Sequence, residues 1–162
     1  DCNKLQKITI DPLRTNFAND CFENCISLKI LEIVKNDFLI NRFSSETFPN
    51  ISQIKIPGTV QKLGDKCFAN FKVLEEIFLP SSIISIGKFS FANCFSLKKI
   101  EINGFIDEIQ IGCFIRCRSL QNISLKDSIE KIAKNAFKET SLVEFKIPSN
   151  VHSIGESSCL KK

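Results

Sequence analysis

The sequence is poor in the residues on which most active sites depend. His152 is its only histidine, and it stands between apolar residues at a position expected to be solvated. General acid–base catalysis would therefore have to rest on carboxylates, which are scattered along the chain. Neither Gly58 nor Gly64 is followed by the Lys-Ser or Lys-Thr of a phosphate-binding loop. We expect no catalytic residue, no cofactor and no metal, and we predict that the protein is not an enzyme.

Long hydrophobic runs and clusters of one charge are also missing. Apolar runs such as Ile83-Ile84 are far shorter than the roughly 18 residues that a membrane-spanning helix requires. The 22 basic and 18 acidic residues are intermixed and leave a net charge of +4. Such a balance creates no strong field toward nucleic acid or a membrane surface. We therefore expect no nucleic-acid partner and no membrane insertion.

What the sequence has instead is a repeat of 23 residues. Its first, fourth and sixth positions are apolar in all seven copies, 21 positions altogether, whereas composition alone would make about nine of them apolar. The first positions are Leu5, Leu28, Ile51, Leu74, Leu97, Leu120 and Leu142; the fourth are Ile8, Leu31, Ile54, Ile77, Ile100, Ile123 and Phe145; the sixth are Ile10, Ile33, Ile56, Leu79, Ile102, Leu125 and Ile147. The fourth and sixth positions are two apart, which predicts one face of a short strand.

The second half of the repeat is also patterned. An apolar residue twelve places after the first position, such as Leu63, predicts a second extended stretch, and a phenylalanine such as Phe68 follows in five of the repeats. We expect a short helical turn around Cys67 and Phe68. Arg14 and Asp37 replace the usual Val or Ile ten positions into the first two repeats, which makes those repeats candidates for looser packing or an N-terminal cap.

One repeat cannot bury its apolar side alone, but stacked neighbours can. We therefore predict a single domain over residues 1–162, built from about seven repeats of which the last is incomplete. In-register parallel strands would advance by about 4.8 Å per repeat and give a rod of roughly 33 Å.

Two segments carry a resemblance to a known family. The segments at residues 54–68, IKIPGTVQKLGDKCF, and 91–100, FANCFSLKKI, resemble the leucine-rich repeats of the BspA-like family. The resemblance implies an α/β-type leucine-rich repeat solenoid without catalytic motifs. Proteins of this kind are common at the surfaces of bacteria and parasitic protists, where they support adhesion.

The resemblance favours a cell-surface or secreted adhesion module. Its partner would be an unidentified protein, such as a host or extracellular matrix protein. The alternative is a cytoplasmic interaction scaffold with reduced, buried cysteines. The sequence leaves the oligomeric state open.

The eight cysteines follow the repeat. Cys2, Cys25, Cys94 and Cys117 share one slot with Phe and Thr, and Cys21, Cys67 and Cys113 share another with Ser and Ala; Cys159 takes a Phe slot. Such interchange is typical of small buried packing residues. Alternatively, Cys2 with Cys25 and Cys94 with Cys117 lie one repeat apart, so their Cα atoms would be about 5 Å apart and could be bridged in an oxidising compartment. A zinc site is disfavoured, because the two Cys pairs with helical spacing lie roughly 19 Å apart.

Two glycosylation sequons, at Asn50 and Asn122, are compatible with secretion but arise easily by chance.

The strand residues that point away from the core should form rows across the sheet. One row is Thr9, Glu32, Lys55, Phe78, Glu101, Ser124 and Lys146, and its neighbour is Lys7, Ile30, Gln53, Glu76, Lys99, Asn122 and Glu144. Facing opposite charges, such as Glu32 with Lys55 and Glu76 with Lys99, would keep the strands in register. Phe78 has the makeup of an interface anchor, unless it packs sideways on a neighbouring strand or lies beneath a part of the chain that is missing from this sequence. We predict a partner-binding patch of Lys55, Glu76, Phe78, Lys99 and Glu101.

Overall fold

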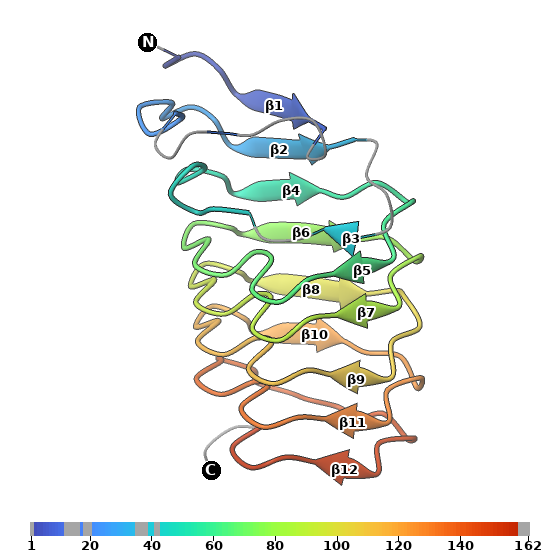
Figure 1. Cartoon of the computed structure of the whole chain (residues 1–162). Helices are drawn as coiled ribbons and strands as arrows, with labels where there is room; N and C mark the ends of the chain where they lie inside the picture. Colours follow the sequence, from blue (N-terminus) through green and yellow to red (C-terminus); the bar gives the residue numbers. More distant parts are fainter. Residues whose placement is uncertain (1, 12–16, 18–20, 35–38, 41–42, 159–162) are drawn as a thin grey trace.

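Each of the second to sixth repeats crosses the molecule twice, once in a strand of three or four residues and once in a strand of two (Figure 1). The computed structural model describes residues 2–11, 17, 21–34, 39–40 and 43–158. The longer strands are β1 (Lys7–Ile10), β2 (Ile30–Ile33), β4 (Gln53–Lys55), β6 (Glu76–Leu79), β8 (Lys99–Ile102) and β10 (Asn122–Ser124). The two-residue strands are β3 (Leu39–Ile40), β5 (Lys62–Leu63), β7 (Ser85–Ile86), β9 (Glu108–Ile109), β11 (Lys131–Ile132) and β12 (Ser153–Ile154).

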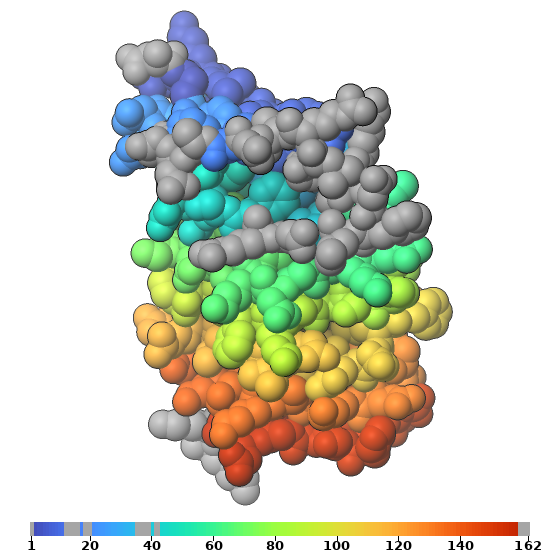
Figure 2. Space-filling model, in the orientation of Figure 1, coloured from blue at the N-terminus to red at the C-terminus, as the bar shows by residue number. Residues whose placement is uncertain are grey.

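The strands form three parallel sheets. The longer strands make one six-stranded sheet in the order β1-β2-β4-β6-β8-β10, and the short strands make the sheets β3-β5-β7 and β9-β11-β12. Partners are 23 residues apart between adjacent long strands, as in Ile54, Ile77 and Ile100. Successive repeats therefore lie on one another as bands from the N-terminus to the C-terminus (Figure 2). The predicted solenoid of in-register parallel strands is confirmed.

The core is the inside of this coil. Leu74, Leu97 and Leu120 are completely buried, as the stacking of first positions requires. Burial is less complete in the two end repeats, where Leu5 is 38% and Ile147 is 45% exposed although Ile10 and Leu142 are still buried. A core residue that lacks a stacked neighbour on one side keeps part of its surface open.

A column of phenylalanine rings runs along the core. Phe68, Phe91, Phe114 and Phe137 stack with successive ring centroids 5.8, 5.4 and 5.5 Å apart. The second repeat has Ser45 in the equivalent position, but the ring of Phe43 stacks on that of Phe68 at 5.7 Å. The column is thus continued by a residue from a different slot.

The expected short helical turns are wrong: the described residues contain no helix, and turns occupy these segments instead. In each of the third to sixth repeats two positions have positive φ, for example Lys66 (56°) and Asn70 (67°), which breaks right-handed helical geometry. Alternate amides also bond to the next repeat rather than along the chain. The N–H groups of Lys66, Phe68 and Asn70 donate to the carbonyls of Lys88, Ser90 and Ala92.

The seventh repeat departs from the others. It contributes β12, but residues 143–147 form no strand beside β10. Val143 is 80% exposed, and its N–H makes one long hydrogen bond of 3.4 Å to the carbonyl of Gln121. The solenoid therefore has about six complete turns.

Three sequence-based interpretations concern residues outside the described ones: those on Arg14, Asp37 and Cys159. Within the described residues, no helix has the length and apolar character needed to cross a bilayer.

Candidate functional site

Strand alternation decides which side chains of the six-stranded sheet face outward. Along β6, Ile77 and Leu79 are buried while Glu76 and Phe78 are exposed. β8 repeats this pattern, so Lys99 is also exposed. Because the register pairs identical slots of successive repeats, outward residues of β6 lie beside outward residues of β8.

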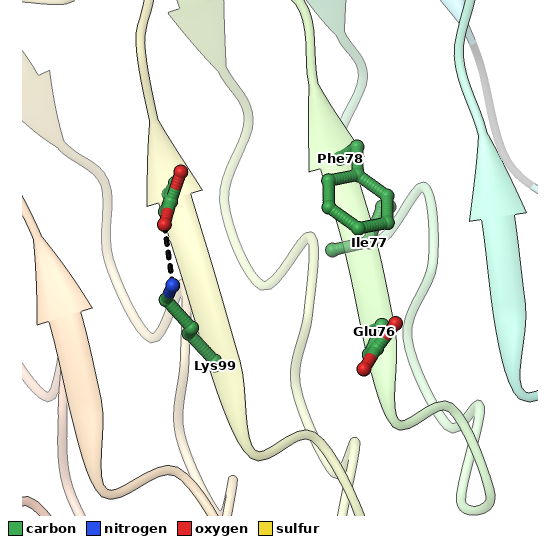
Figure 3. A pocket seen from close by; sticks show the side chains of 5 residues that line it. Glu76, Ile77, Phe78 and Lys99 are labelled. Atoms are coloured by element: carbon green, nitrogen blue, oxygen red, sulfur yellow. Dashed lines mark ion pairs between the residues drawn. The ribbon is translucent and has the colours of Figure 1, made fainter.

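A pocket of about 160 Å³ lies between these two strands. It is lined by Glu76, Ile77, Phe78, Lys99 and Glu101. In the close-up, Glu76 and Phe78 stand on β6 and Lys99 on the neighbouring strand (Figure 3). The register pairs Glu76 with Lys99 and Phe78 with Glu101, so the four outward residues form the corners of the pocket.

Four of the five residues of the predicted patch line this pocket. The fifth, Lys55, is the register partner of Phe78 on β4 and lies on the other side of the ring. Sequence reasoning did not single out Ile77, which is buried and contributes an apolar part of the pocket wall. Ile77 occupies the fourth position of its repeat, which predicts a core residue, so the pattern did not place it in the surface patch.

The charges of the pocket pair along β8 rather than across the strands. Lys99 forms an ion pair with Glu101, marked by the dashed line in Figure 3. This contact raises the pKa of Lys99 and lowers the pKa of Glu101, and the nearby charge of Glu76 raises the pKa of Lys99 further. Glu76 accepts a hydrogen bond of 3.5 Å from Gln53 Nε2.

Glu32, near the N-terminal end of the sheet, also forms its ion pair with a residue other than the one that was expected. It faces Lys55 in register, as expected, but its ion pair is with Lys7 of β1. That contact, together with the charges of Lys7 and Lys55, lowers the pKa of Glu32, while partial desolvation opposes the shift. For these two predicted pairs the facing charges are present, but the close contacts are diagonal or along one strand. The short strands differ, because the register partners Lys131 and Glu108 form an ion pair at 3.1 Å.

Phe78 projects into solvent. Its exposed fraction is 65%, and within the described part of the chain no other ring and no cation stacks on it. This differs from the alternative in which Phe78 packs sideways on a neighbouring strand. Among the described residues, cations lie over the rings of Phe95, which carries Arg118 at 5.2 Å, and Phe105, which carries Lys126 at 4.4 Å.

The cysteines of the first slot differ between the two ends of the molecule. Cys2 and Cys25 form a disulfide with Cα atoms 4.9 Å apart. The bridge considered between Cys94 and Cys117 is not formed, and both residues are reduced. Their thiols donate instead to backbone carbonyls, Cys94 Sγ to Phe68 O at 3.2 Å and Cys117 Sγ to Phe91 O at 3.1 Å.

The buried thiols have low reactivity at neutral pH. Burial raises the pKa of Cys67, Cys94 and Cys113 well above the ordinary value of a thiol. Burial also raises the pKa of Cys117 to about 12. Because the thiolate is the reactive and metal-binding form, these residues act as packing groups at neutral pH.

The remaining sequence-predicted positions are spread over the surface. Asn122 is exposed on β10, whereas Asn50 is half-buried in a turn. The side chain of His152 is exposed, and its backbone N–H donates to the backbone carbonyl of Glu130. In the described ranges, no three His, Cys, Asp or Glu side chains are grouped so as to hold a metal ion.

Comparison with known proteins places the sequence within one repeat family. Residues 1–49 and 39–161 match the family described as BspA type leucine rich repeat region, in six copies. No curated protein matches the chain in sequence.

Three solved structures share the fold. A leucine-rich repeat protein from Bacteroides ovatus is 22% identical with a TM-score of 0.58, over 95% of this chain and 46% of its own. A leucine rich cell surface protein from Faecalibacterium prausnitzii is 22% identical with a TM-score of 0.54, over 93% and 43%. A leucine-rich repeat protein from Eubacterium ventriosum is 19% identical with a TM-score of 0.54, over 97% and 60%. The chain thus spans between 43% and 60% of the length of these proteins.

Proposed function

Because the chain belongs to the BspA-type leucine-rich repeat family, we propose that it binds a protein partner through the outward face of its six-stranded sheet. The contact is centred on the Phe78 surface, which consists of Lys55, Glu76, Phe78, Lys99 and Glu101. The observation that carries the proposal is the 65% exposure of Phe78 beside a pocket. An aromatic side chain held in solvent by a rigid sheet is the usual makeup of an interface anchor.

The surroundings of Phe78 suit such an anchor. Charged residues stand on both sides of the ring, with Lys55 on β4 and Glu101 on β8. In protein interfaces, a polar rim of this kind shields a central aromatic contact from water and favours the correct partner. Exposed rim charges contribute little affinity of their own. Most of the binding energy at this surface should therefore come from Phe78.

We place this binding role at the cell surface or outside the cell, as an adhesion module for a host or extracellular matrix protein. Three observations support that location. The Faecalibacterium prausnitzii protein of the same fold is described as a cell surface protein. Cys2 and Cys25 are bridged, and disulfides persist mainly in oxidising compartments. The sequon at Asn122 is exposed, which glycosylation requires.

A cytoplasmic interaction scaffold is the second candidate, and the reduced interior cysteines favour it. Cys94, Cys113 and Cys117 are reduced although two of them share the slot of the bridged pair. Thiol titration of natively purified protein in denaturant separates the two candidates. An extracellular protein should lack the two thiols of Cys2 and Cys25 until a reductant is added, whereas a cytoplasmic one should show all eight cysteines.

The binding role is tested with two matched variants. Phe78→Ala and Phe105→Ala each remove an exposed ring, of 65% and 71% exposure, but only Phe78 lines the pocket. Binding of each variant to intact host cells and to purified extracellular matrix proteins is compared with the unchanged protein. Phe78→Ala should weaken binding by about tenfold or more, and Phe105→Ala should leave it unchanged. Full affinity of a folded Phe78→Ala variant would contradict the proposed surface.

A further inference from the structure

We propose that the pocket between Phe78 and the Lys99–Glu101 ion pair receives an arginine side chain of the protein partner. This inference rests on the proposed function and names the chemistry that the Phe78 surface recognises. Three features carry it: an aromatic ring without a cation, a carboxylate without an ion pair, and a wall that is partly apolar.

The aromatic ring is the first feature. Phe95 carries Arg118 and Phe105 carries Lys126, at 5.2 and 4.4 Å from the ring centroids. In the part of the chain that the structure describes, Phe78 has no such cation, although it is 65% exposed and stands on a sheet with lysines. A cation placed over its open face would be attracted by the ring. The contact that the chain supplies to Phe95 and Phe105 is left at Phe78 for a ligand.

The carboxylates are the second feature. Lys99 is the register partner of Glu76, but its ammonium group pairs with Glu101 on its own strand. Glu76 keeps one hydrogen bond, from Gln53 Nε2 at 3.5 Å, and within the described ranges it has no ion pair. The pocket therefore holds two carboxylates and one ammonium group, because Lys55 lies outside it. This leaves a net negative charge for an incoming cation.

The lining of the pocket favours arginine over lysine. A guanidinium group is planar, so it can stack on the ring of Phe78 while its edge donates hydrogen bonds to a carboxylate such as Glu76. The methylene stem of the arginine can lie against the apolar wall near Ile77, which lines the pocket. A lysine ammonium is a strongly hydrated point charge and loses more hydration in the same place.

Lys99 is the internal competitor of the ligand. The ammonium group of Lys99 forms an ion pair with Glu101, which is the register partner of Phe78. Neutralising Lys99 should free this carboxylate for the guanidinium group. We therefore expect Lys99→Gln to strengthen arginine binding and Glu76→Gln to weaken it.

The test is an NMR titration of the folded protein with N-acetyl-arginine amide, N-acetyl-citrulline amide and N-acetyl-lysine amide. Citrulline has the shape of arginine without its charge. The chain has no Tyr or Trp, so its aromatic signals come from 15 Phe and one His, and the signal lost in Phe78→Leu identifies Phe78. Arginine should shift this signal and bind about 3- to 10-fold more tightly than citrulline, with lysine between them. Glu76→Gln should weaken arginine binding about threefold, and Lys99→Gln should strengthen it about twofold.

Equal binding of arginine and citrulline, tighter binding of lysine, or no binding at all would overturn the proposal. So would arginine affinity that is unchanged in both Glu76→Gln and Phe78→Leu. These results are separable from a failure of the proposed function. If Phe78→Ala weakens adhesion while the arginine amide does not bind, the surface is correct and its ligand chemistry is wrong. If Phe78→Ala leaves adhesion unchanged, the surface itself is wrong.

Discussion

The ring of Phe91 lies on the ring of Phe114 with centroids 5.4 Å apart and planes inclined by 2°. Both side chains are completely buried, and they belong to the same slot of adjacent repeats. Their contact links two repeats through the core and not only through the sheets. The phenylalanine column is therefore part of what holds the solenoid in register.

The first prediction concerns this column. Phe91→Ala should lower the free energy of unfolding by about 3 to 5 kcal/mol, because it removes a buried ring and leaves a cavity beside two stacked neighbours. Guanidinium chloride unfolding followed by circular dichroism measures the change. Phe105→Ala removes a ring that is 71% exposed and should cost no more than about 0.5 kcal/mol. Equal effects of the two variants would contradict the stacked interior.

The second prediction compares two glycines. A Cβ atom at Gly104 would clash with the backbone carbonyl of Ile83, whereas a Cβ atom at Gly58 meets nothing within 4 Å. Gly104→Ala should therefore destabilise the protein by about 1 to 3 kcal/mol through the forced backbone shift. Gly58→Ala should be neutral or stabilise by up to about 1 kcal/mol, because it restricts the unfolded chain. Thermal unfolding of both variants measures the difference, and a tolerated Gly104→Ala would show that the repeats are packed less closely.

The third prediction is a loss of stability at alkaline pH. Burial raises the pKa of Cys94 and Cys113 above the ordinary value of 9.0, and that of Cys117 to about 12. Well below pH 9 the thiols are protonated in both the folded and the unfolded chain, so they add no pH dependence. Above it the unfolded chain releases thiol protons that the folded chain retains, so the stability falls as the pH rises toward 12. The slope is about 1.4 kcal/mol per pH unit for each thiol.

Chemical denaturation at about pH 8 and about pH 10.5 measures this slope. A Cys117→Ala variant serves as the control, because it keeps all the lysines, which also titrate in this range. The fall in stability should be smaller in the variant than in the unchanged protein. Parallel curves for the two proteins would mean that the thiol of Cys117 ionises as easily in the folded state as in the unfolded state.

Strand positions and register could be predicted from the sequence, because they follow from apolar periodicity. Ile54, Ile77 and Ile100 occur at intervals of 23 and pair across adjacent strands. Burial at the ends could not be predicted in the same way: Leu5 is 38% exposed although it has the same repeat position as the buried Leu74, because burial also needs a neighbouring repeat that the pattern of one repeat does not report.

The turn conformation could not be predicted in this way. Asn and Gly, which favour positive φ, occupy only some of the turn positions that adopt it, such as Asn70; others hold residues such as Lys66 and Phe89, so residue type does not mark them consistently. They are stabilised by hydrogen bonds to the next repeat, for example from the N–H of Phe89 to the carbonyl of Ile111. Such contacts exist only once the repeats are stacked.

Part of the candidate site could be predicted from the periodicity of the strands. Alternation along the strands predicted that Glu76 and Phe78 face outward together, and register placed Lys99 and Glu101 beside them. The choice of ion pair was not predictable, because Lys99 can reach either Glu76 across the strands or Glu101 along its own. Side-chain conformation decides between them, and it is this choice that leaves Glu76 without an ion pair in the described structure.

The whole interpretation depends on alternate strand residues facing inward and outward. Comparing Ile100→Ala with Lys99→Ala tests this directly, because these two neighbours on β8 face opposite ways: Ile100 is 1% exposed, whereas the side chain of Lys99 is 64% exposed. In guanidinium chloride unfolding, Ile100→Ala should cost about 2 to 5 kcal/mol, and Lys99→Ala should change stability by less than about 0.5 kcal/mol. A small effect at Ile100, or a large one at Lys99, would contradict the register and with it the surface around Phe78.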